Sequence, residues 1–213
     1  KRTGVEEYMH ELLHHLFSID QTNEYRLFYN SLKDIPGPTI EFSYPNVKTI
    51  RLRYPNKILN ASLKYLRMPK IDKILGGADI LFVPNFRIAP VTSACVKILT
   101  VHDLSFELFP EFFSLRRRLW HKFVSPKKEV SEAHHVIAVS EHTKQHIQEA
   151  YGTPQEKILV SYPGSSSLFA NNISQSELDR VKLNYNLPEQ FMLYLGTLEP
   201  RKNIESLLVA FSK

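Results

Sequence analysis

The chain has 213 residues, a length that fits one generous domain or one domain with part of another. Hydrophobic residues at 43% and charged residues at 23% lie near globular averages, which excludes a disordered, collagen-like or heptad-fibre protein. The single cysteine, Cys95, excludes an internal disulfide and a multi-cysteine metal centre, and it fits a reducing compartment. Charged residues interrupt every apolar run before the roughly 18 residues that a membrane span requires.

The net charge of +5 is concentrated in one segment of the chain. The segment Phe112–Lys128, called the basic segment below, has a charge of +6 and no acidic residue. The remaining 21 basic and 22 acidic residues give −1, so the rest of the chain is nearly neutral. Proteins that coat nucleic acids tend instead to be basic throughout.

The predicted elements alternate between helices and strands. No signal peptide is recognised, and the apolar spacing from Val5 to Leu16 predicts an amphipathic helix at the start. Predicted strands are Tyr25–Tyr29, Thr49–Tyr54, Ile80–Val83, Ile98–Val101, Val136–Val139, Ile158–Tyr162 and Phe191–Leu195. Predicted helices are Leu59–Leu75, Leu115–Ala133 and Glu141–Ala150, the last capped by Ser140. This order predicts an α/β fold with a mostly parallel sheet covered on both faces.

Polar residues follow three near-continuous apolar strands that we expect at the centre of this sheet. Ligands of open α/β sheets bind beyond the carboxyl ends of the strands. We therefore expect three pairs of residues to line one cleft: Pro84 with Asn85, His102 with Asp103, and Ser140 with Glu141.

Three segments make up the predicted domain organisation. Residues 1–163 form an N-terminal Rossmann-like domain, and the Ser- and Asn-rich residues 164–190 form a linker. Residues 191–213 supply one strand and one helix, which cannot form a core alone, so we expect the first βα unit of an incomplete second domain. The amino end is also expected to lack a preceding strand.

The five residues His10–His14 match the HExxH pattern of zinc peptidases. On a helix, however, His10, Glu11 and His14 fall opposite an apolar face centred near Leu16, and no third ligand is marked downstream. We therefore favour a solvated helix face and expect no metal site.

The last βα unit has the features of an anion site. A glycine turn at Gly196 precedes a helix opened by Pro200, Arg201 and Lys202, where free N–H groups and cations attract phosphate. A packed connection with exposed cations is the alternative, and the residues alone leave both open.

Several stretches resemble glycosyltransferase family 4, mannosyltransferase-like members in particular. They are Arg2–Tyr8, Thr100–Pro110, Val136–Glu141, Val160–Gly164 and Phe191–Phe211, which together span nearly the whole chain. The resemblance implies a GT-B architecture, in which two Rossmann-like domains face each other across a cleft. The acceptor would bind the N-terminal domain and the nucleotide sugar the C-terminal one, without a metal ion or other cofactor.

The resemblance also implies roles for individual residues. His102 would meet the transferred sugar, and Asp103 would hold His102 or a sugar hydroxyl. Arg201 and Lys202 would neutralise the donor diphosphate, with Gly196 letting the backbone approach it. Gly4, where many members have two glycines, would lie near the phosphates or the acceptor.

The expected function is that of a retaining glycosyltransferase. It would move a hexose such as mannose, with GDP-mannose as a candidate donor, to a glycan or lipid-linked acceptor in polysaccharide biosynthesis. The family's paired glutamates would lie beyond Lys213, so we expect little or no transfer from these residues alone. The alternative is a non-catalytic Rossmann-like binding domain.

The basic segment mixes cations with apolar side chains, which is the pattern of an interfacial helix. Arg116, Arg117, Arg118 and Lys122 would contact an anionic membrane or acceptor, and a core-packing helix with solvated cations is the alternative. The expected location is cytoplasmic, with peripheral contact on the inner membrane face. We do not expect nucleic-acid binding, because separate basic patches and aromatic-bearing strands are lacking.

Overall fold

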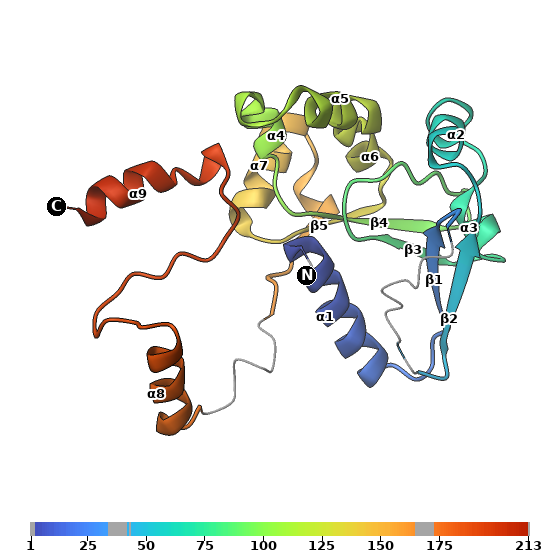
Figure 1. Ribbon diagram of the computed structural model, residues 1–213. Helices are drawn as coiled ribbons and strands as arrows, with labels where there is room; N and C mark the ends of the chain where they lie inside the picture. Colours follow the sequence, from blue (N-terminus) through green and yellow to red (C-terminus); the bar gives the residue numbers. More distant parts are fainter. Residues whose placement is uncertain (1–2, 34–41, 43, 165–172, 213) are drawn as a thin grey trace. The chain divides into compact units, whose positions relative to one another are not determined.

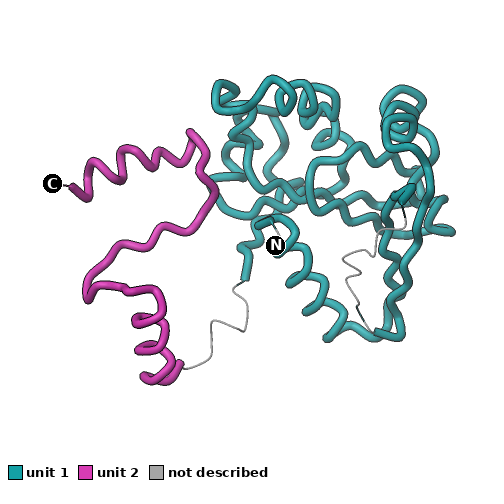
Figure 2. The backbone as a smooth tube through the Cα atoms, in the orientation of Figure 1, with its two compact units in different colours: residues 1–164 teal, residues 165–213 magenta. Residues whose placement is uncertain are grey.

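The computed structural model describes residues 3–33, 42, 44–164 and 173–212. The chain forms two compact units, Lys1–Gly164 and Ser165–Lys213 (Figure 2). Residues 165–172 of the predicted linker, and Arg2 of the first family-like stretch, lie outside the described residues. Each unit is described below by itself.

The strands of the first unit are all parallel, as predicted. β1 (Tyr25–Asn30) pairs with β2 (Val47–Leu52). The other sheet has the order β3 (Ile80–Val83), β4 (Val96–Val101), β5 (His135–Ala138) and β6 (Ile158–Val160). The described strands thus form two sheets. Arg26 of β1 donates hydrogen bonds to the carbonyls of Leu75 and Gly77, between α3 and β3.

Helices flank these sheets, with α1 on one side of the four-stranded sheet and α5, α6 and α7 on the other (Figure 1). The α-helices are α1 (Gly4–Ile19), α2 (Asn56–Ala61), α3 (Ile71–Ile74), α4 (Ser105–Leu108), α5 (Leu115–Val124), α6 (Pro126–Glu132) and α7 (Glu141–Tyr151). A π-helical turn, η1 (Ser62–Leu66), and the 3-10 turns η2 (Pro110–Phe112) and η3 (Gln155–Lys157) complete the set. The predicted α/β class is confirmed.

Two predicted helices are broken by proline. Leu115–Ala133 divides into α5 and α6 at Ser125, whose φ of 57° precedes Pro126. Proline lacks an N–H donor and disfavours the helical conformation of the residue before it. Leu59–Leu75 is interrupted between η1 and α3, where Arg67 follows η1 with a φ of 56° and Pro69 stands two residues further on.

The core lies around β4 and β5, where Leu99, Val101, Val136 and Ala138 have no exposed surface. Val130 of α6 and Ile147 of α7 belong to the same cluster. The prediction of buried central strands is thus confirmed for β4 and β5. It is wrong for Ile80, which is 59% exposed because β3 lies at the edge of its sheet.

The second unit has less structure than predicted. Its helices are α8 (Gln175–Asn184), η5 (Pro200–Lys202) and α9 (Ile204–Phe211), and α8 confirms the weak helical pattern in the linker. The strand predicted at Phe191–Leu195 is absent, and Leu195 is 91% exposed. A strand needs a neighbour for its N–H and C=O groups, and no described segment pairs with this one.

Within the described ranges, no helix combines the length and the apolar character that crossing a bilayer demands.

Candidate active site at the strand ends

His102 lies directly beyond the carboxyl end of β4, half-buried. Its Nε2 atom is 2.9 Å from the carbonyl oxygen of Pro84, which follows β3. A carbonyl oxygen only accepts hydrogen bonds, so Nε2 carries a hydrogen and donates it. In the neutral ring, Nδ1 is then the atom with a lone pair for a ligand.

Tyr8 of α1 packs against the His102 ring. The two ring centroids are 4.9 Å apart, with the planes perpendicular. This contact places the first turns of α1 next to the strand ends. Gly4 begins α1, and a Cβ atom added there would meet no other atom within 4 Å, so the backbone at Gly4 is open to an approaching ligand.

Ser140 is connected to His102 through Thr143. The Ser140 hydroxyl oxygen caps α7 by accepting from the Thr143 N–H at 3.1 Å, which confirms the predicted cap. The Thr143 hydroxyl donates to the His102 carbonyl oxygen at 3.3 Å. The ends of β3, β4 and β5 are therefore tied together around His102, as the parallel topology predicts.

Asp103 does not hold His102. Its Oδ1 atom accepts hydrogen bonds from the backbone N–H and the hydroxyl of Ser105, at 2.9 and 2.6 Å. These bonds form a local turn that opens α4, a common use of an aspartate two residues ahead of a serine. Of the two predicted roles of Asp103, to hold His102 or a sugar hydroxyl, the contact with a sugar hydroxyl is the one open to this exposed carboxylate, and it stays a prediction.

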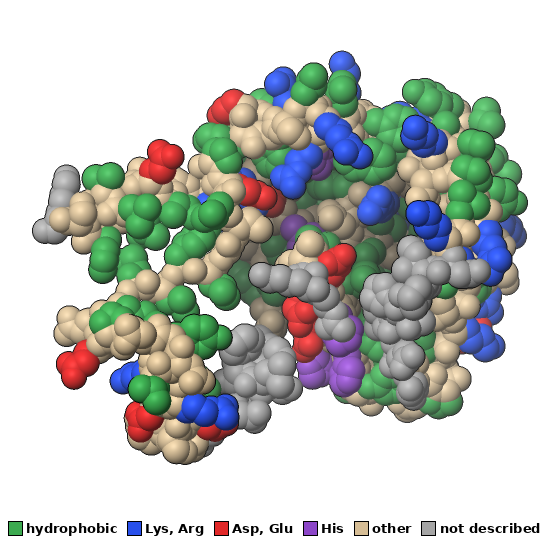
Figure 3. All heavy atoms as spheres, viewed as in Figure 1, with side chains coloured by type: hydrophobic (Ala, Val, Ile, Leu, Met, Phe, Trp, Pro, Cys, Tyr) green, Lys and Arg blue, Asp and Glu red, His purple; other side chains and the backbone are tan. Residues whose placement is uncertain are grey.

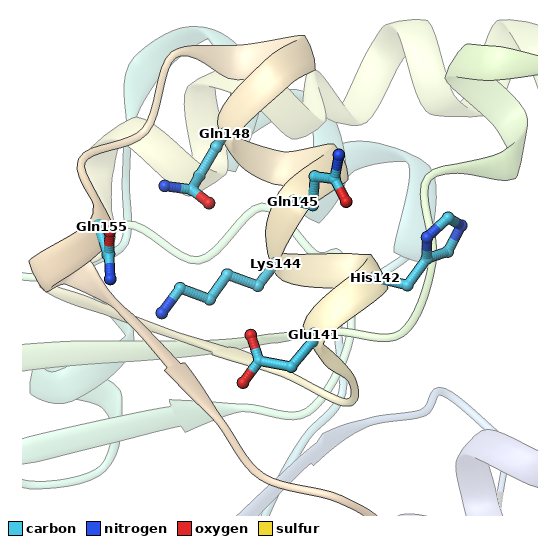
Figure 4. Close-up of a pocket in the computed structure, with 6 residues that line it drawn as sticks. All are labelled: Glu141, His142, Lys144, Gln145, Gln148 and Gln155. Atoms are coloured by element: carbon cyan, nitrogen blue, oxygen red, sulfur yellow. The ribbon is translucent and has the colours of Figure 1, made fainter.

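The remaining predicted cleft residues have local roles. Asn85 accepts a hydrogen bond from the Phe86 N–H at 2.7 Å. Glu141 lines a hollow of about 400 Å³ along α7, where its side chain and that of Lys144 extend to the same side of the helix (Figure 4). His102 does not line this hollow, so a cleft shared by Asn85, Ser140 and Glu141 stays a prediction.

The first unit as a whole matches the model of Glycosyltransferase Family 4 over residues 2–165. The chain belongs to glycosyltransferase family 4. The family membership suggested by the sequence is thereby confirmed, and the parallel α/β fold is consistent with the Rossmann-like GT-B architecture.

Curated relatives carry mannosyltransferase names. The chain is 30% identical over 129 residues to the O-antigen chain mannosyltransferase B of Escherichia coli, covering 60% of this chain and 33% of that protein. It is 29% identical over 91 residues to the serotype-specific mannosyltransferase WbdA of Escherichia coli, covering 42% of this chain and 11% of that protein. The chain thus spans a third or less of the length of these relatives.

The HExxH match lies on α1. The described residues contain no group of three His, Cys, Asp or Glu side chains that could hold a metal ion. The prediction that His10 faces solvent opposite the apolar face is wrong, because its ring stacks on Phe42 with centroids 5.6 Å apart. Leu13 and Phe17 are the buried residues of α1, and they share a helix face with His10 at i+3 and i+7.

The anion-site residues of the second unit lie outside the family-matched range. Arg201 donates from Nε to a Glu199 carboxylate oxygen at 2.8 Å, and Lys202 is exposed. No side chain caps α9, so its first N–H groups keep their capacity for an anion. At Gly196, an added Cβ would lie 2.7 Å from the Tyr194 hydroxyl. Phosphate binding here stays a prediction.

Tyr8 and Thr143 are the contact residues of His102 that the sequence did not indicate. Tyr8 ends the family-like stretch Arg2–Tyr8 and lies in the predicted first helix, one turn from Gly4, but neither pattern predicts its contact with His102. Thr143 is the third residue of α7 after its cap, the position whose N–H the cap accepts. A hydroxyl side chain at that position, close to a strand end, is the signal that could have predicted the contact of Thr143 with His102.

Proposed function

We propose that the protein is a retaining glycosyltransferase that moves a hexose from a nucleotide sugar to a glycan or lipid-linked acceptor. The observation that carries the proposal is the fixed position of His102, which Pro84, Tyr8 and Thr143 hold at the carboxyl ends of parallel strands. Family membership supports sugar transfer, and the names of the relatives favour mannose. GDP-mannose is the candidate donor.

In this proposal, each predicted residue has one task. His102 presents Nδ1 to the transferred sugar, and the exposed Asp103 carboxylate accepts from a sugar hydroxyl. Gly4 leaves its backbone open at the acceptor side. Arg201 and Lys202 offset the negative charge that grows on the leaving diphosphate, so they stabilise the transition state more than the ground state. Gly196 would admit the diphosphate once the Tyr194 hydroxyl moves aside.

We also propose a cytoplasmic location with a peripheral contact at an anionic membrane. Exposed Arg116, Arg117 and Arg118 and Lys122 of α5 supply the cations for this contact. Such a contact would keep the enzyme near a lipid-linked acceptor or a growing surface polysaccharide.

The experiment is a calorimetric titration of the complete protein with GDP-mannose, UDP-glucose and ADP-glucose, followed by analysis of the product. We expect GDP-mannose to bind most tightly, and NMR of the product to show the same anomeric configuration as the donor. An inverted product would contradict the retaining mechanism. Ligand binding without transfer to any glycan or lipid-linked acceptor would favour a non-catalytic binding domain.

A further inference from the structure

Tyr8, in the second turn of α1, meets the His102 ring with centroids 4.9 Å apart and the ring planes perpendicular. The two residues are 94 positions apart in the chain, so the contact joins α1 to the end of β4. A phenylalanine at position 8 would pack against His102 in the same way. Packing alone therefore leaves the Tyr8 hydroxyl without a role.

The Tyr8 hydroxyl has unused hydrogen-bonding capacity. Within the described ranges, the ring contact with His102 is the interaction of Tyr8, and no residue exchanges a hydrogen bond with its hydroxyl. Tyr8 is half-buried, and a tyrosine hydroxyl that leaves bulk water usually has a partner. A phenol both donates and accepts hydrogen bonds, so a ligand hydroxyl could be that partner.

Helix geometry directs the Tyr8 side chain toward the start of α1. Side chains on a helix lean toward its N-terminus and lie over the residue four positions earlier, which here is Gly4. Gly4 is exposed, and a Cβ atom added there would meet no other atom within 4 Å. The face of α1 that carries Tyr8 therefore ends in open space, which a larger residue at position 4 would partly fill.

The start of α1 is accessible from solvent. In the space-filling view, the surface is hollowed between α5 and α1, with acidic and histidine side chains over α1 (Figure 3). Thr3 and Glu6 close a capping box, in which each side chain accepts a hydrogen bond from a backbone N–H of the first turn. Capping thus engages these two polar side chains, whereas the Tyr8 hydroxyl is left for a ligand.

The ring of Tyr8 restricts the orientation of His102. The hydrogen bond from Nε2 to the Pro84 carbonyl, at 2.9 Å, fixes one atom of the imidazole, and the second side-chain torsion of a histidine is otherwise broad. A perpendicular aromatic neighbour at 4.9 Å removes much of that freedom. Nδ1, the nitrogen with the lone pair, is then held in one direction.

We propose that Tyr8 is a substrate-contacting residue of the strand-end site: its ring positions the His102 imidazole, and its hydroxyl hydrogen-bonds a sugar hydroxyl that lies next to His102. A sugar hydroxyl fits better than a phosphate, because the phenol carries no positive charge and Glu6 and Glu7 make the first turn acidic. The transferred hexose and the acceptor glycan both offer such a hydroxyl. The inference rests on the proposed sugar transfer and adds one binding residue to it.

Three substitutions in the complete protein separate the ring from the hydroxyl, with GDP-mannose as donor and mannotriose as acceptor. Tyr8→Phe keeps the ring, Tyr8→Leu removes ring and hydroxyl, and Tyr65→Phe is the control on an exposed ring of η1. We expect Tyr8→Phe to raise KM for one substrate about 2- to 10-fold at an unchanged kcat, the effect of one neutral hydrogen bond. Tyr8→Leu should also lower kcat about tenfold or more, because His102 is misplaced. Tyr65→Phe should change neither value.

The substrate whose KM rises in Tyr8→Phe identifies the sugar that the hydroxyl contacts. Nitrogen-15 NMR of the histidine rings adds a measurement that does not depend on transfer, and the His102 signal is the one missing from His102→Ala. We expect His102 to carry its hydrogen on Nε2 in the original protein and in Tyr8→Phe, and to be a mixture of both tautomers in Tyr8→Leu. Urea denaturation verifies that each variant is folded.

Two results would overturn the proposal. An unchanged His102 signal in folded Tyr8→Leu would remove the positioning role of the ring, and unchanged KM values for both substrates in Tyr8→Phe would remove the hydroxyl contact. Absence of transfer by the original protein contradicts the proposed function instead. In that case the NMR comparison, and calorimetric titration of Tyr8→Phe with GDP-mannose and mannotriose, still test Tyr8.

Discussion

The two units of the chain hold the residues of their sequence motifs in different ways. In Lys1–Gly164, His102 contacts residues that are 18, 41 and 94 positions away in the chain. In the described part of Ser165–Lys213, side-chain hydrogen bonds join residues two to four positions apart, and no residue is buried. The first unit fixes its site by tertiary packing, and the second only by local bonds.

This difference shows what a motif needs to become a site. Thr143 bonds to the His102 carbonyl because β4 and α7 share a buried core, and Tyr8 contacts the His102 ring from α1. Arg201 bonds with Glu199, two residues away in the chain, so the bond that orients its guanidinium is a local one. The strand-end site is thus preorganised within its unit, whereas the arginine and lysine of the second unit depend on further contacts to be placed.

The largest expected effect is on the stability of the first unit. Lys97 and Glu129 form an ion pair in which each side chain is 1% exposed, with Arg67 at 3.6 Å from the same carboxylate. Glu129→Ala leaves the Lys97 ammonium buried without its partner, so we expect the free energy of unfolding to fall by about 3–5 kcal/mol. Urea denaturation followed by circular dichroism measures the change.

The control for that variant lies in the second unit. Glu205→Ala removes an exposed carboxylate from the first turn of α9, and we expect it to change the unfolding free energy by less than about 0.5 kcal/mol. If the two variants had equal effects, the contrast between a packed and a locally bonded unit would be wrong.

An intermediate effect is expected from Arg201→Gln in the complete protein. Loss of one charged hydrogen bond, worth about 1.5–3 kcal/mol, should weaken binding of the nucleotide sugar by about 10- to 100-fold. The same substitution at Arg180, an exposed residue of α8, should leave binding unchanged. Calorimetric titration measures both affinities, and equal affinities for the two variants would remove Arg201 from the donor site.

The smallest expected effect is a pH dependence of the first unit at His121. Burial lowers the pKa of His121 from 6.5; the charges of Glu107 and Asp103 oppose this shift, and Arg117 adds to it. As the pH falls through about 6.5, the unfolded chain takes up a proton before the folded chain does, so stability falls.

The variant His121→Phe tests this pH dependence, because it keeps an aromatic ring next to Phe106, on which His121 stacks with centroids 4.0 Å apart. We expect the variant to lose less stability than the original protein between pH 7.5 and 5.5, as urea denaturation at a series of pH values would show. Parallel stability curves would contradict the prediction.

Local patterns predicted the parts of the first unit that depend on neighbours in the chain. The apolar runs of β4 and β5 and the Ser140 cap were predicted because strand propensity and capping are short-range properties. The turn at Asp103 is local too, and an aspartate two residues before a serine is the pattern that could have predicted it.

Features that depend on distant partners could not be predicted in the same way. His10 packs on Phe42, so its burial follows from a tertiary contact that helix periodicity does not encode. The segment Phe191–Leu195 has strand-forming residues but no described neighbour to accept its backbone hydrogen bonds. The contact between Tyr8 and His102 likewise joins residues that only the sheet topology brings together.

The most direct test of the account is the rate of sugar transfer by the complete protein after His102→Ala. Loss of a positioned group that meets the reacting sugar should lower kcat by about 100-fold or more, with an unchanged unfolding curve. His135→Ala, at the amino end of the neighbouring strand β5, should transfer at the original rate. A folded His102→Ala variant that also transferred at the original rate would contradict the assignment of the active site to the strand ends.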